Sequence, residues 1–268
     1  MPSNQQVVWI TGASSGIGKE MALQYAAKGY AVAVSARRVD LLEYLVTEIK
    51  NKGGNALVVE CDVINERSIE NAVQAVTAHF GEIDIAVANA GSGVVGFMEN
   101  LSQKEWERQF NINVIGLAMT AKYAVPELKK TKGRLVLIGS IASFIPNPYL
   151  AAYGASKAAV HNIGESYQIE LSGTGVTCTT LHPGFVDSNI TRVNNEGVFN
   201  PEAKDPRPAN LMWPTDKAVK DMIRAIDRRK KVKVITGHGK VITFIGRFFP
   251  GIARAMVAKQ IKEILKSQ

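Results

Sequence analysis

Cysteine is scarce in this sequence of 268 residues, and its beginning lacks the features of a secretory leader. The two cysteines, Cys61 and Cys178, both fall in apolar runs typical of strands, which favours buried thiols in a reducing compartment. The first residues, MPSNQQ, have no basic start, and the apolar run VVWIT that follows is too short for a leader. These absences argue against a secreted, disulfide-stabilised domain and predict a cytoplasmic protein.

The sequence also predicts no transmembrane helix. Residues 135–156 carry no charge and are numerous enough to cross a bilayer. However, the stretch contains Pro146-Asn147-Pro148, and its first part has the length and composition of a buried strand. We therefore expect this run to lie inside the fold.

Acidic residues are few at the C-terminal end. Residues 217–268 contain 14 Lys and Arg against three acidic residues, so this end carries +11 and the rest carries 8 − 11 = −3. A mildly acidic body argues against a nucleic-acid-binding domain spread over the whole protein. The basic end leaves open an acidic membrane surface or an acidic partner.

What the sequence does contain is a regular alternation of apolar strand-like runs and helical patterns. This alternation predicts an α/β fold: a single doubly wound domain, with a parallel sheet covered by helices on both faces. One long helix is expected over residues 103–130. The seven strands are expected within residues 6–11, 30–36, 55–63, 83–91, 133–140, 175–184 and 232–236.

A glycine-rich loop follows the first predicted strand. Glycines at such a place permit a tight turn and close approach of the backbone to a phosphate, and the following helix offers free N–H groups. The spacing is G-x-x-x-G-x-G, and the strand–turn–helix context predicts dinucleotide binding. The loop residues expected to bind are Gly12, Ser14, Ser15, Gly16, Ile17 and Gly18.

The end of the second strand indicates which dinucleotide is bound. An acidic residue there would bind the ribose 2′-hydroxyl of NAD and repel a 2′-phosphate, but this chain has Arg37 and Arg38. A guanidinium pairs well with phosphate oxygens. Arg37 therefore favours NADP(H) as the cofactor, whereas for Arg38 a solvated position at the helix start is the alternative.

Candidate acid–base chemistry lies in the Tyr153 region. Tyr153 and Lys157 are four residues apart in a helical pattern, which places both side chains on one face. A neighbouring ammonium would lower the pKa of the phenol, so that the hydroxyl can exchange a proton near neutral pH. Ser140, at the end of the fifth strand, would supply a hydroxyl to bind a substrate oxygen.

Three further motifs occur together with these. They are Asn89-Ala90-Gly91, Asn113 in the run NVIG, and Pro183-Gly184. In this combination and order, residues 7–188 resemble the short-chain dehydrogenase/reductase family. The resemblance implies a single Rossmann-fold domain with seven parallel strands in the order 3-2-1-4-5-6-7. In that order Cys61 and Cys178 lie several strands apart, so both should be free thiols.

The resemblance also implies roles for the site residues. Tyr153 would be the acid/base, Lys157 would lower its pKa and hold the nicotinamide ribose, and Ser140 would orient the substrate carbonyl. Asn113 would anchor a water that relays protons from Lys157. The adenosine contacts would be Asp62, Val63, Asn89, Ala90 and Gly91. The nicotinamide contacts would be Pro183, Gly184, Val186 and Ser188, the last standing where many members carry threonine. No metal site is expected.

Apolar residues are expected around the substrate. The residues predicted to border the nicotinamide are Val94, Val95, Phe97, Ile141, Phe144 and Tyr149. Residues 189–214 form an irregular, proline-containing stretch that we expect to be a loop or lid over the site, with a simple connector as the alternative. Together they predict a lipophilic ketone or aldehyde and its alcohol as the substrate pair.

The C-terminal extension, residues 240–268, follows a catalytic domain of residues 1–239. Its apolar residues recur at helical spacing among Lys and Arg, and Pro250 should break the helix in two. This end is similar to the lipid- and steroid-active branch of the family. Three interpretations remain open: packing on the chain itself or on a partner subunit, a peripheral membrane helix, or a substrate-entry flap.

The sequence therefore predicts an NADP(H)-dependent carbonyl reductase active in lipid metabolism. One alternative is a β-ketoacyl reductase acting on a carrier protein or CoA ester. Another is a non-catalytic NADP(H)-binding regulatory protein on the same fold. A homodimer or homotetramer is expected, paired through the helices at residues 103–130 and 152–171, as is common in the family. No nucleic-acid partner is expected.

Overall fold

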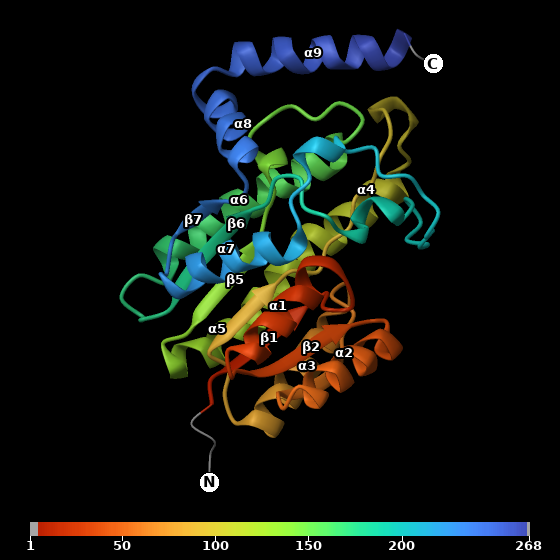
Figure 1. Cartoon of the computed structure of the whole chain (residues 1–268). Coiled ribbons are helices and arrows are strands. Elements are labelled where there is room, and N and C mark those ends of the chain that lie inside the picture. Colours follow the sequence, from red (N-terminus) through yellow and green to blue (C-terminus); the bar gives the residue numbers. More distant parts are fainter. Residues whose placement is uncertain (1–4, 267–268) are drawn as a thin grey trace.

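A parallel sheet of seven strands, in the order β3-β2-β1-β4-β5-β6-β7, forms the centre of the protein (Figure 1). The computed structural model describes residues 5–266, with side chains up to residue 259. The predicted fold class and strand order are confirmed. The strands are β1 (Val7–Thr11), β2 (Ala31–Ala36), β3 (Asn55–Glu60), β4 (Ile85–Ala88), β5 (Arg134–Ile138), β6 (Thr177–His182) and β7 (Val232–Val234).

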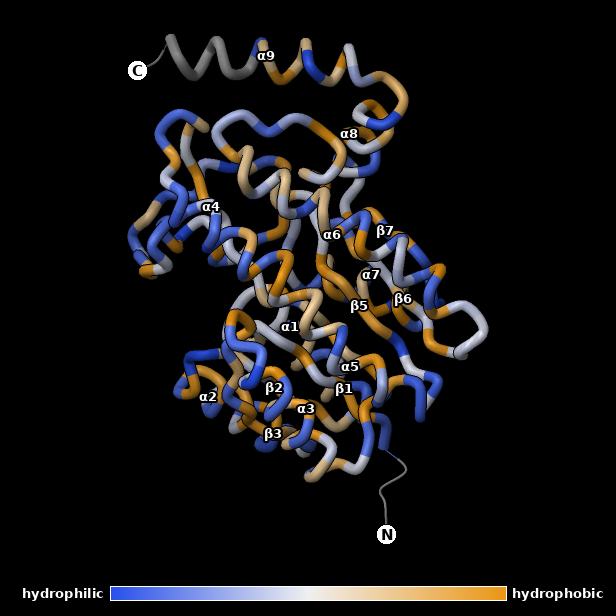
Figure 2. Tube along the Cα trace, turned by 180° about the vertical axis from the view of Figure 1, so that it is seen from behind, coloured by the Kyte–Doolittle hydropathy of each residue, from blue (hydrophilic) through white to orange (hydrophobic). Residues whose placement is uncertain are grey.

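The central strand β1 shows why the strands are apolar along their whole length. Successive side chains of a strand point to opposite faces, and here helices cover both faces. Val8 and Ile10 belong to one core, and Val7 and Trp9 belong to the other. Figure 2 shows the hydrophobic segments gathered in these central strands.

Helices form a layer on each face of the sheet. The helices α1 (Gly16–Ala27), α2 (Val39–Asn51) and α7 (Thr215–Asp227) pack on one core. The helices α3 (Glu66–Phe80), α5 (Leu117–Thr131) and α6 (Ala151–Glu170) pack on the other. The strand order reverses between β1 and β4, and ligands of such sheets bind outside the carboxyl ends of the strands at this point.

The long helix predicted over residues 103–130 consists of three segments in series. The segments are α4 (Gln103–Phe110), the π-helical turn η2 (Asn111–Gly116) and α5. A capping box of Ser102 and Glu105 starts α4. The prediction of one regular helix was thus wrong in the middle, where the wider π-helical turn carries Asn113.

Short turns connect the remaining elements. They are the 3-10 turns η1 (Met98–Asn100), η3 (Ile141–Ser143), η4 (Asn189–Arg192) and η5 (Ala209–Leu211). Residues 189–214 are irregular, as expected, but are tied by isolated bridges between Val193 and Phe199 and, at their base, between Val186 and Trp213. This stretch is therefore an ordered loop.

The C-terminal part of the chain forms α8 (Gly237–Phe248) and α9 (Pro250–Lys266), so the predicted break at Pro250 is confirmed. Residues 267–268 of the predicted extension lie outside the described residues. Within residues 5–266 no single helix is long and apolar enough to cross a membrane. Only α8 and α9 taken together as far as Lys259 reach that length and composition, and they are bent by 119°.

Both cysteines are free and buried, as predicted. Cys61 directly follows β3 and Cys178 lies in β6, on opposite sides of the sheet centre. Burial raises the pKa of Cys61 to about 11 and that of Cys178 to about 12, so neither thiol is reactive at neutral pH.

Candidate active site

One cleft at the carboxyl ends of the strands brings together most of the predicted site residues. Of the residues predicted for the cofactor and the chemistry, Gly18 and Asn113 do not line it, because both lie just behind its wall. The predicted residues that line the cleft are Gly12, Ser14, Ser15, Gly16, Ile17, Arg37, Arg38, Asp62, Val63, Asn89, Ala90, Gly91, Ser140, Tyr153, Lys157, Pro183, Gly184, Val186 and Ser188.

The glycine-rich loop passes so close to its neighbours that side chains do not fit. Gly12 has φ +67°, and a Cβ atom there would lie 2.7 Å from the Cα of Ala90. A Cβ atom on Gly18 would lie 2.5 Å from the Nδ2 of Asn89. Asn89 in turn donates from Nδ2 to the carbonyls of Thr11, at 2.9 Å, and Gly12, at 3.1 Å. The loop is thereby fixed in front of the N-terminus of α1, which offers free N–H groups to a pyrophosphate.

Three arginines make this end of the cleft strongly basic. Arg37 and Arg38 follow β2, and Arg38 donates to the Oγ of Ser14 at 2.8 Å. Arg108 reaches the cleft from α4, and burial, followed by the charge of Arg37, lowers its pKa. None of the three forms an ion pair with a carboxylate of the described residues. The site therefore fits a ligand that brings several negative charges.

Asn113 is completely buried behind the floor of the cleft. Its Oδ1 accepts from the Ser92 N–H at 2.9 Å, and its Nδ2 donates to the Ser92 carbonyl and the Ser156 Oγ, both at 3.0 Å. A Cβ atom on Gly91 would lie 3.4 Å from this Oδ1 and 3.7 Å from the Nζ of Lys157. The π-helical turn, a form often found at functional sites, thus brings Asn113 next to Lys157.

Ser140, Tyr153 and Lys157 meet at the opposite end of the cleft. The Nζ of Lys157 is 5.9 Å from the centre of the Tyr153 ring and donates to the carbonyl of Ile138 at 2.8 Å. Burial lowers the pKa of Lys157 to about 8. Burial raises the pKa of Tyr153 above its usual value, and the neighbouring Ser140 side chain and the charge of Arg207 offset only part of this rise. The predicted lowering of the phenol pKa by Lys157 stays a prediction, because the Lys157 amine is buried and turned to the Ile138 carbonyl in this structure.

The backbone carbonyl of Ser140 is hydrogen-bonded to a buried histidine, His182. The Nδ1 of His182 lies 3.0 Å from the Ser140 carbonyl, which can only accept, so Nδ1 carries the proton. Burial lowers the pKa of His182 to about 4, so the ring is neutral at working pH. Phe144 packs edge-on against this ring, with centroids 4.8 Å apart.

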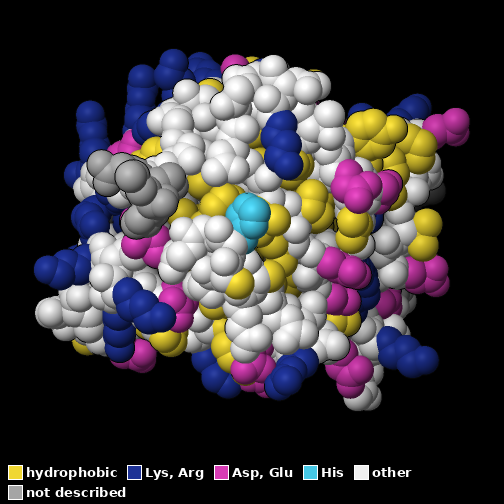
Figure 3. All heavy atoms as spheres, turned by 90° about the horizontal axis from the view of Figure 1, so that it is seen from below, with side chains coloured by type: hydrophobic (Ala, Val, Ile, Leu, Met, Phe, Trp, Pro, Cys, Tyr) yellow, Lys and Arg dark blue, Asp and Glu magenta, His cyan; other side chains and the backbone are white. Residues whose placement is uncertain are grey.

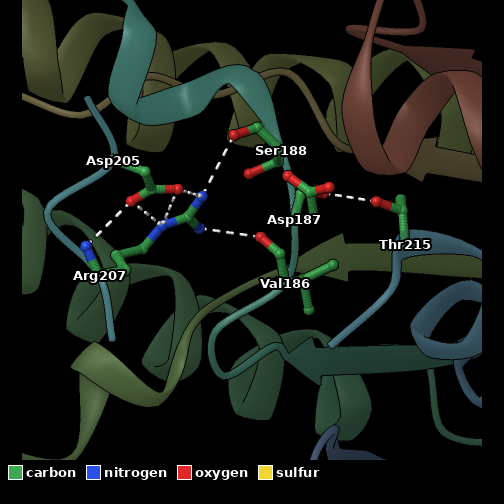
Figure 4. Close-up of polar contacts among 6 residues, drawn as sticks. All are labelled: Val186, Asp187, Ser188, Asp205, Arg207 and Thr215. Carbon is green, nitrogen blue, oxygen red and sulfur yellow. Dashed lines mark hydrogen bonds and ion pairs between the residues drawn. The ribbon is translucent and has the colours of Figure 1, made fainter. Parts of the chain in front are cut away.

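Arg207 connects the irregular loop to Val186 and Ser188, two of the residues predicted to contact the nicotinamide (Figure 4). Its guanidinium donates to the carbonyls of Val186, at 2.8 Å, and Ser188, at 3.2 Å, and pairs with the carboxylate of Asp205 at 2.6 Å. The side chain of Arg207 is only 15% exposed. We call this group of contacts the Arg207 clamp; it fixes residues 186–188 and places a positive charge near Tyr153.

The first turn of α8 supports the same segment from behind. The Nε2 of His238 accepts from the N–H of Phe185 at 3.1 Å, and the two rings stack with centroids 5.2 Å apart. A Cβ atom on Gly184 would collide with the Oγ1 of Thr236 and with the ring of His238. Residues 183–188 are therefore held between the Arg207 clamp and α8.

A family model for the short chain dehydrogenases matches residues 6–198. The chain belongs to this family. Its members are oxidoreductases, and the solved relatives named below carry NADP- or NAD-type cofactors. The glycine-rich loop, the arginines and Asn89 are the residues that would hold such a dinucleotide in this cleft.

Three similar proteins illustrate the range of the family. The 11-beta-hydroxysteroid dehydrogenase-like 3 of Arabidopsis thaliana is 36% identical over 189 residues, covering 70% of this chain and 61% of that protein. An alcohol dehydrogenase of Thermococcus sibiricus complexed with 5-hydroxy-NADP has a TM-score of 0.75 at 29% identity, covering 86% of this chain and 96% of that chain. A 3-ketoacyl-(acyl-carrier-protein) reductase of Brucella melitensis complexed with NADH has a TM-score of 0.76 at 25% identity, covering 87% and 98%.

The substrate side of this dehydrogenase differs from the sequence prediction. Val94 and Ile141 are buried in the core, and Phe144 packs against His182. None of the six apolar residues predicted to border the nicotinamide lines the cleft. The prediction placed them by their proximity in sequence to Gly91 and Ser140, but the side chains of Val94 and Ile141 are buried, whereas those of Val95 and Tyr149 are exposed. The loop after β6 contributes the apolar side chains of Ile190, Val193 and Phe199 to the lining of the cleft.

Sequence reasoning also missed several polar residues of this dehydrogenase. They are Arg207 with Asp205, Arg108, His182 and His238. Each acts through a partner far along the chain, such as the carbonyl of Val186 for Arg207. The only local signal is the position of His182 at the end of a predicted strand, next to Pro183-Gly184.

Proposed function

We propose that this short-chain dehydrogenase uses NADP(H) to interconvert a lipophilic ketone or aldehyde and the corresponding alcohol. The observation that carries the proposal is that Ser140, Tyr153 and Lys157 meet at one end of a cleft whose other end is a glycine-rich loop lined by unpaired arginines. A bound nicotinamide dinucleotide supplies or accepts the hydride in this reaction.

Tyr153 moves the proton in the proposed mechanism. In reduction, its hydroxyl donates a proton to the substrate oxygen, while Ser140 binds the same oxygen and orients it. The Ser140 hydroxyl and the charge of Arg207 stabilise the phenolate that remains. Lys157, 5.9 Å from the centre of the tyrosine ring, turns from the Ile138 carbonyl to hold the cofactor ribose and adds its charge to that stabilisation.

The preference for NADP(H) rests on the chain after β2. No carboxylate stands there, and the guanidinium groups of Arg37 and Arg38 lie at the cleft. A 2′-phosphate placed between them would form charge-assisted hydrogen bonds, which a ribose hydroxyl cannot match.

Exchanging the charge of Arg37 tests this preference. Arg37→Asp should weaken NADPH binding by about 1.5–3 kcal/mol or more, roughly 10- to 150-fold in Kd, because a charge-assisted contact is lost and repulsion is added. NADH binding should stay level or improve. Both constants are measured by fluorescence titration, with Arg228→Asp as the exposed control. A wild-type protein that prefers NADH would contradict the proposal.

A lipophilic substrate is supported by Ile190, Val193 and Phe199 at the cleft and by the name of the Arabidopsis relative. Turnover of NADPH with ketones of graded chain length should increase with the apolar length of the substrate. The similarity to the Brucella reductase supports a second candidate, a β-ketoacyl reductase. If the protein reduces acetoacetyl-CoA faster than every simple ketone, the result favours this candidate. If it turns over no carbonyl compound, the result favours a regulatory, non-catalytic protein.

A homodimer paired through α5 and α6 remains part of the proposal. The outer face of α6 presents the small residues Ala155 and Ala158, and it also exposes Ile169 to 77%. Small exposed residues allow two copies of a helix to approach closely across a two-fold axis.

A further inference from the structure

The helices α8 and α9, which we call the C-terminal arm, extend beyond the body of the molecule (Figures 1 and 2). In both views α9 lies at the end of the molecule where the loops after β5 and β6 are found. The main tertiary contacts of α9 are with α8. The arm therefore has a large surface that the body of the protein does not cover.

Both helices of the arm expose large apolar side chains. Val241, Phe244 and Phe248 are spaced by three and four residues along α8, and Ile252 and Met256 continue the pattern on α9. The exposed fractions of these residues lie between 54% and 61%. The side chains of Phe244 and Phe248, with ring centroids 5.0 Å apart, lie next to Phe249 at the bend between the helices.

The charged residues of the arm are basic, apart from Glu263 near its end. No acidic residue occurs between Asp227 and Glu263 in the sequence, whereas Lys240, Arg247, Arg254 and Lys259 are all exposed. None of these four cations forms an ion pair with a carboxylate elsewhere in the described part of the chain. The opposite end of the molecule differs, because acidic and basic side chains are interspersed there (Figure 3).

We propose that the C-terminal arm docks on the surface of an anionic phospholipid membrane. The exposed aromatic side chains enter the boundary between headgroups and acyl chains, and the four cations bind lipid phosphates. The bend of 119° suits a pair of helices lying on a surface rather than crossing it. Pairing of two arms across a two-fold axis is disfavoured, because the exposed cations of one arm would face those of the other and Glu263 is the one acidic residue in the sequence of the arm.

The arm is firmly connected to the active site. A Cβ atom on Gly246 of α8 would collide with the carbonyl of Phe144, so α8 packs directly on the loop after Ser140. The first turn of α8 holds Phe185 through His238. Docking of the arm thus fixes the loops around the cleft relative to the membrane.

Vesicle sedimentation with the full-length protein tests the docking without any measurement of activity. The protein should sediment with vesicles of phosphatidylcholine and phosphatidylglycerol, and much less with phosphatidylcholine alone. Added salt should weaken the binding, because it screens the surface potential. Equal, salt-independent binding to both kinds of vesicle, or no binding to either, would overturn the proposal.

Two sets of variants separate the apolar and basic contributions. Phe248→Ser with Phe249→Ser should release the protein from anionic vesicles, whereas Tyr44→Ser, at a side chain 78% exposed on the body, should not. Arg254→Gln and Lys259→Gln should each weaken binding by about fivefold. Lys104→Gln and Lys129→Gln on the body are the matched controls and should bind as the wild type does.

A dye-labelled variant tests whether the arm contacts the membrane, and this test works even if the serine variants fold poorly. Because Cys61 and Cys178 are buried, Met256→Cys can be labelled selectively with a polarity-sensitive dye. Its emission should shift to the blue with anionic vesicles, and a dye at Tyr44→Cys should not respond.

Light scattering tests the alternative that the arm is an interface between copies of the chain. If Phe248→Ser with Phe249→Ser halves the mass of the particle, the arm is such an interface and the membrane proposal is wrong.

Discussion

The two walls of the cleft are built in different ways. On the wall formed after β1 to β4, most residues stand within a few positions of a strand end, with Arg108 of α4 as an exception. Backbone contacts such as that of Gly12 with Ala90 fix their place. On the wall formed after β6, an irregular loop is held by side chains, above all by the Arg207 clamp. The backbone of the regular sheet positions the residues of the first wall, whereas the second wall depends on single contacts between side chains and distant parts of the chain. Single substitutions should therefore act differently on the two sides.

The largest effect is expected at Tyr153, where the two walls meet. Tyr153→Phe keeps the shape of the ring and removes the proposed proton donor, so kcat should fall by about 10²- to 10⁴-fold. The Kd for NADPH should remain within about twofold, because the cofactor contacts are unchanged. Stopped-flow turnover and fluorescence titration measure the two quantities. Tyr44→Phe is the control, and a Tyr153→Phe enzyme with most of its activity would refute the acid/base role.

A smaller effect, confined to the irregular wall, is expected from Arg207→Met. The loss of two carbonyl contacts and of the ion pair should lower the free energy of unfolding by about 1–3 kcal/mol. Because the charge of Arg207 lowers the pKa of Tyr153, its removal should also move the pH profile of kcat/KM to higher pH.

The pH profile distinguishes this positioning role from a merely structural one. Arg207→Lys should restore most of the profile, and Asp205→Asn should destabilise the loop but leave the positive charge near Tyr153 in place. An unchanged pH profile in Arg207→Met would mean that the clamp acts only on loop stability.

The smallest effect concerns the protonation of Lys157. Burial lowers its pKa to about 8, so in the free protein the amine is charged below that pH and neutral above it. A charged donor binds more strongly than a neutral one, so the affinity for NADPH should fall by about fivefold as the pH rises through this value. Titrations across the range measure it. Lys157→Arg stays charged, and its affinity should be flat; a flat wild-type curve would contradict the predicted pKa.

The sequence was sufficient for the regular wall and insufficient for the irregular one, for a physical reason. Apolar runs and glycines report local constraints, so the strands, the loop at Gly12 and the Tyr153/Lys157 spacing were predictable from the residues, whereas the strand order came from the resemblance to the family. Arg207 has no such signature, because its role arises from the approach of the carbonyls of Val186 and Ser188 across the fold. The neighbours of Gly91 and Ser140 were misplaced for a related reason: proximity in sequence to a site residue does not decide which way a side chain points.

The bend at Phe249 divides the C-terminal arm into one helix that contacts the surroundings of the cleft and one that does not. α8 supplies His238 and Gly246 to the surroundings of the cleft, whereas α9 supplies none of the cleft residues. A chain shortened after Phe249 retains the packing behind Phe185, but a chain shortened after Thr236 leaves that backbone N–H without its acceptor. Substitutions, fusions or truncations beyond the bend should therefore leave the surroundings of the cleft intact, while those before it should disturb them.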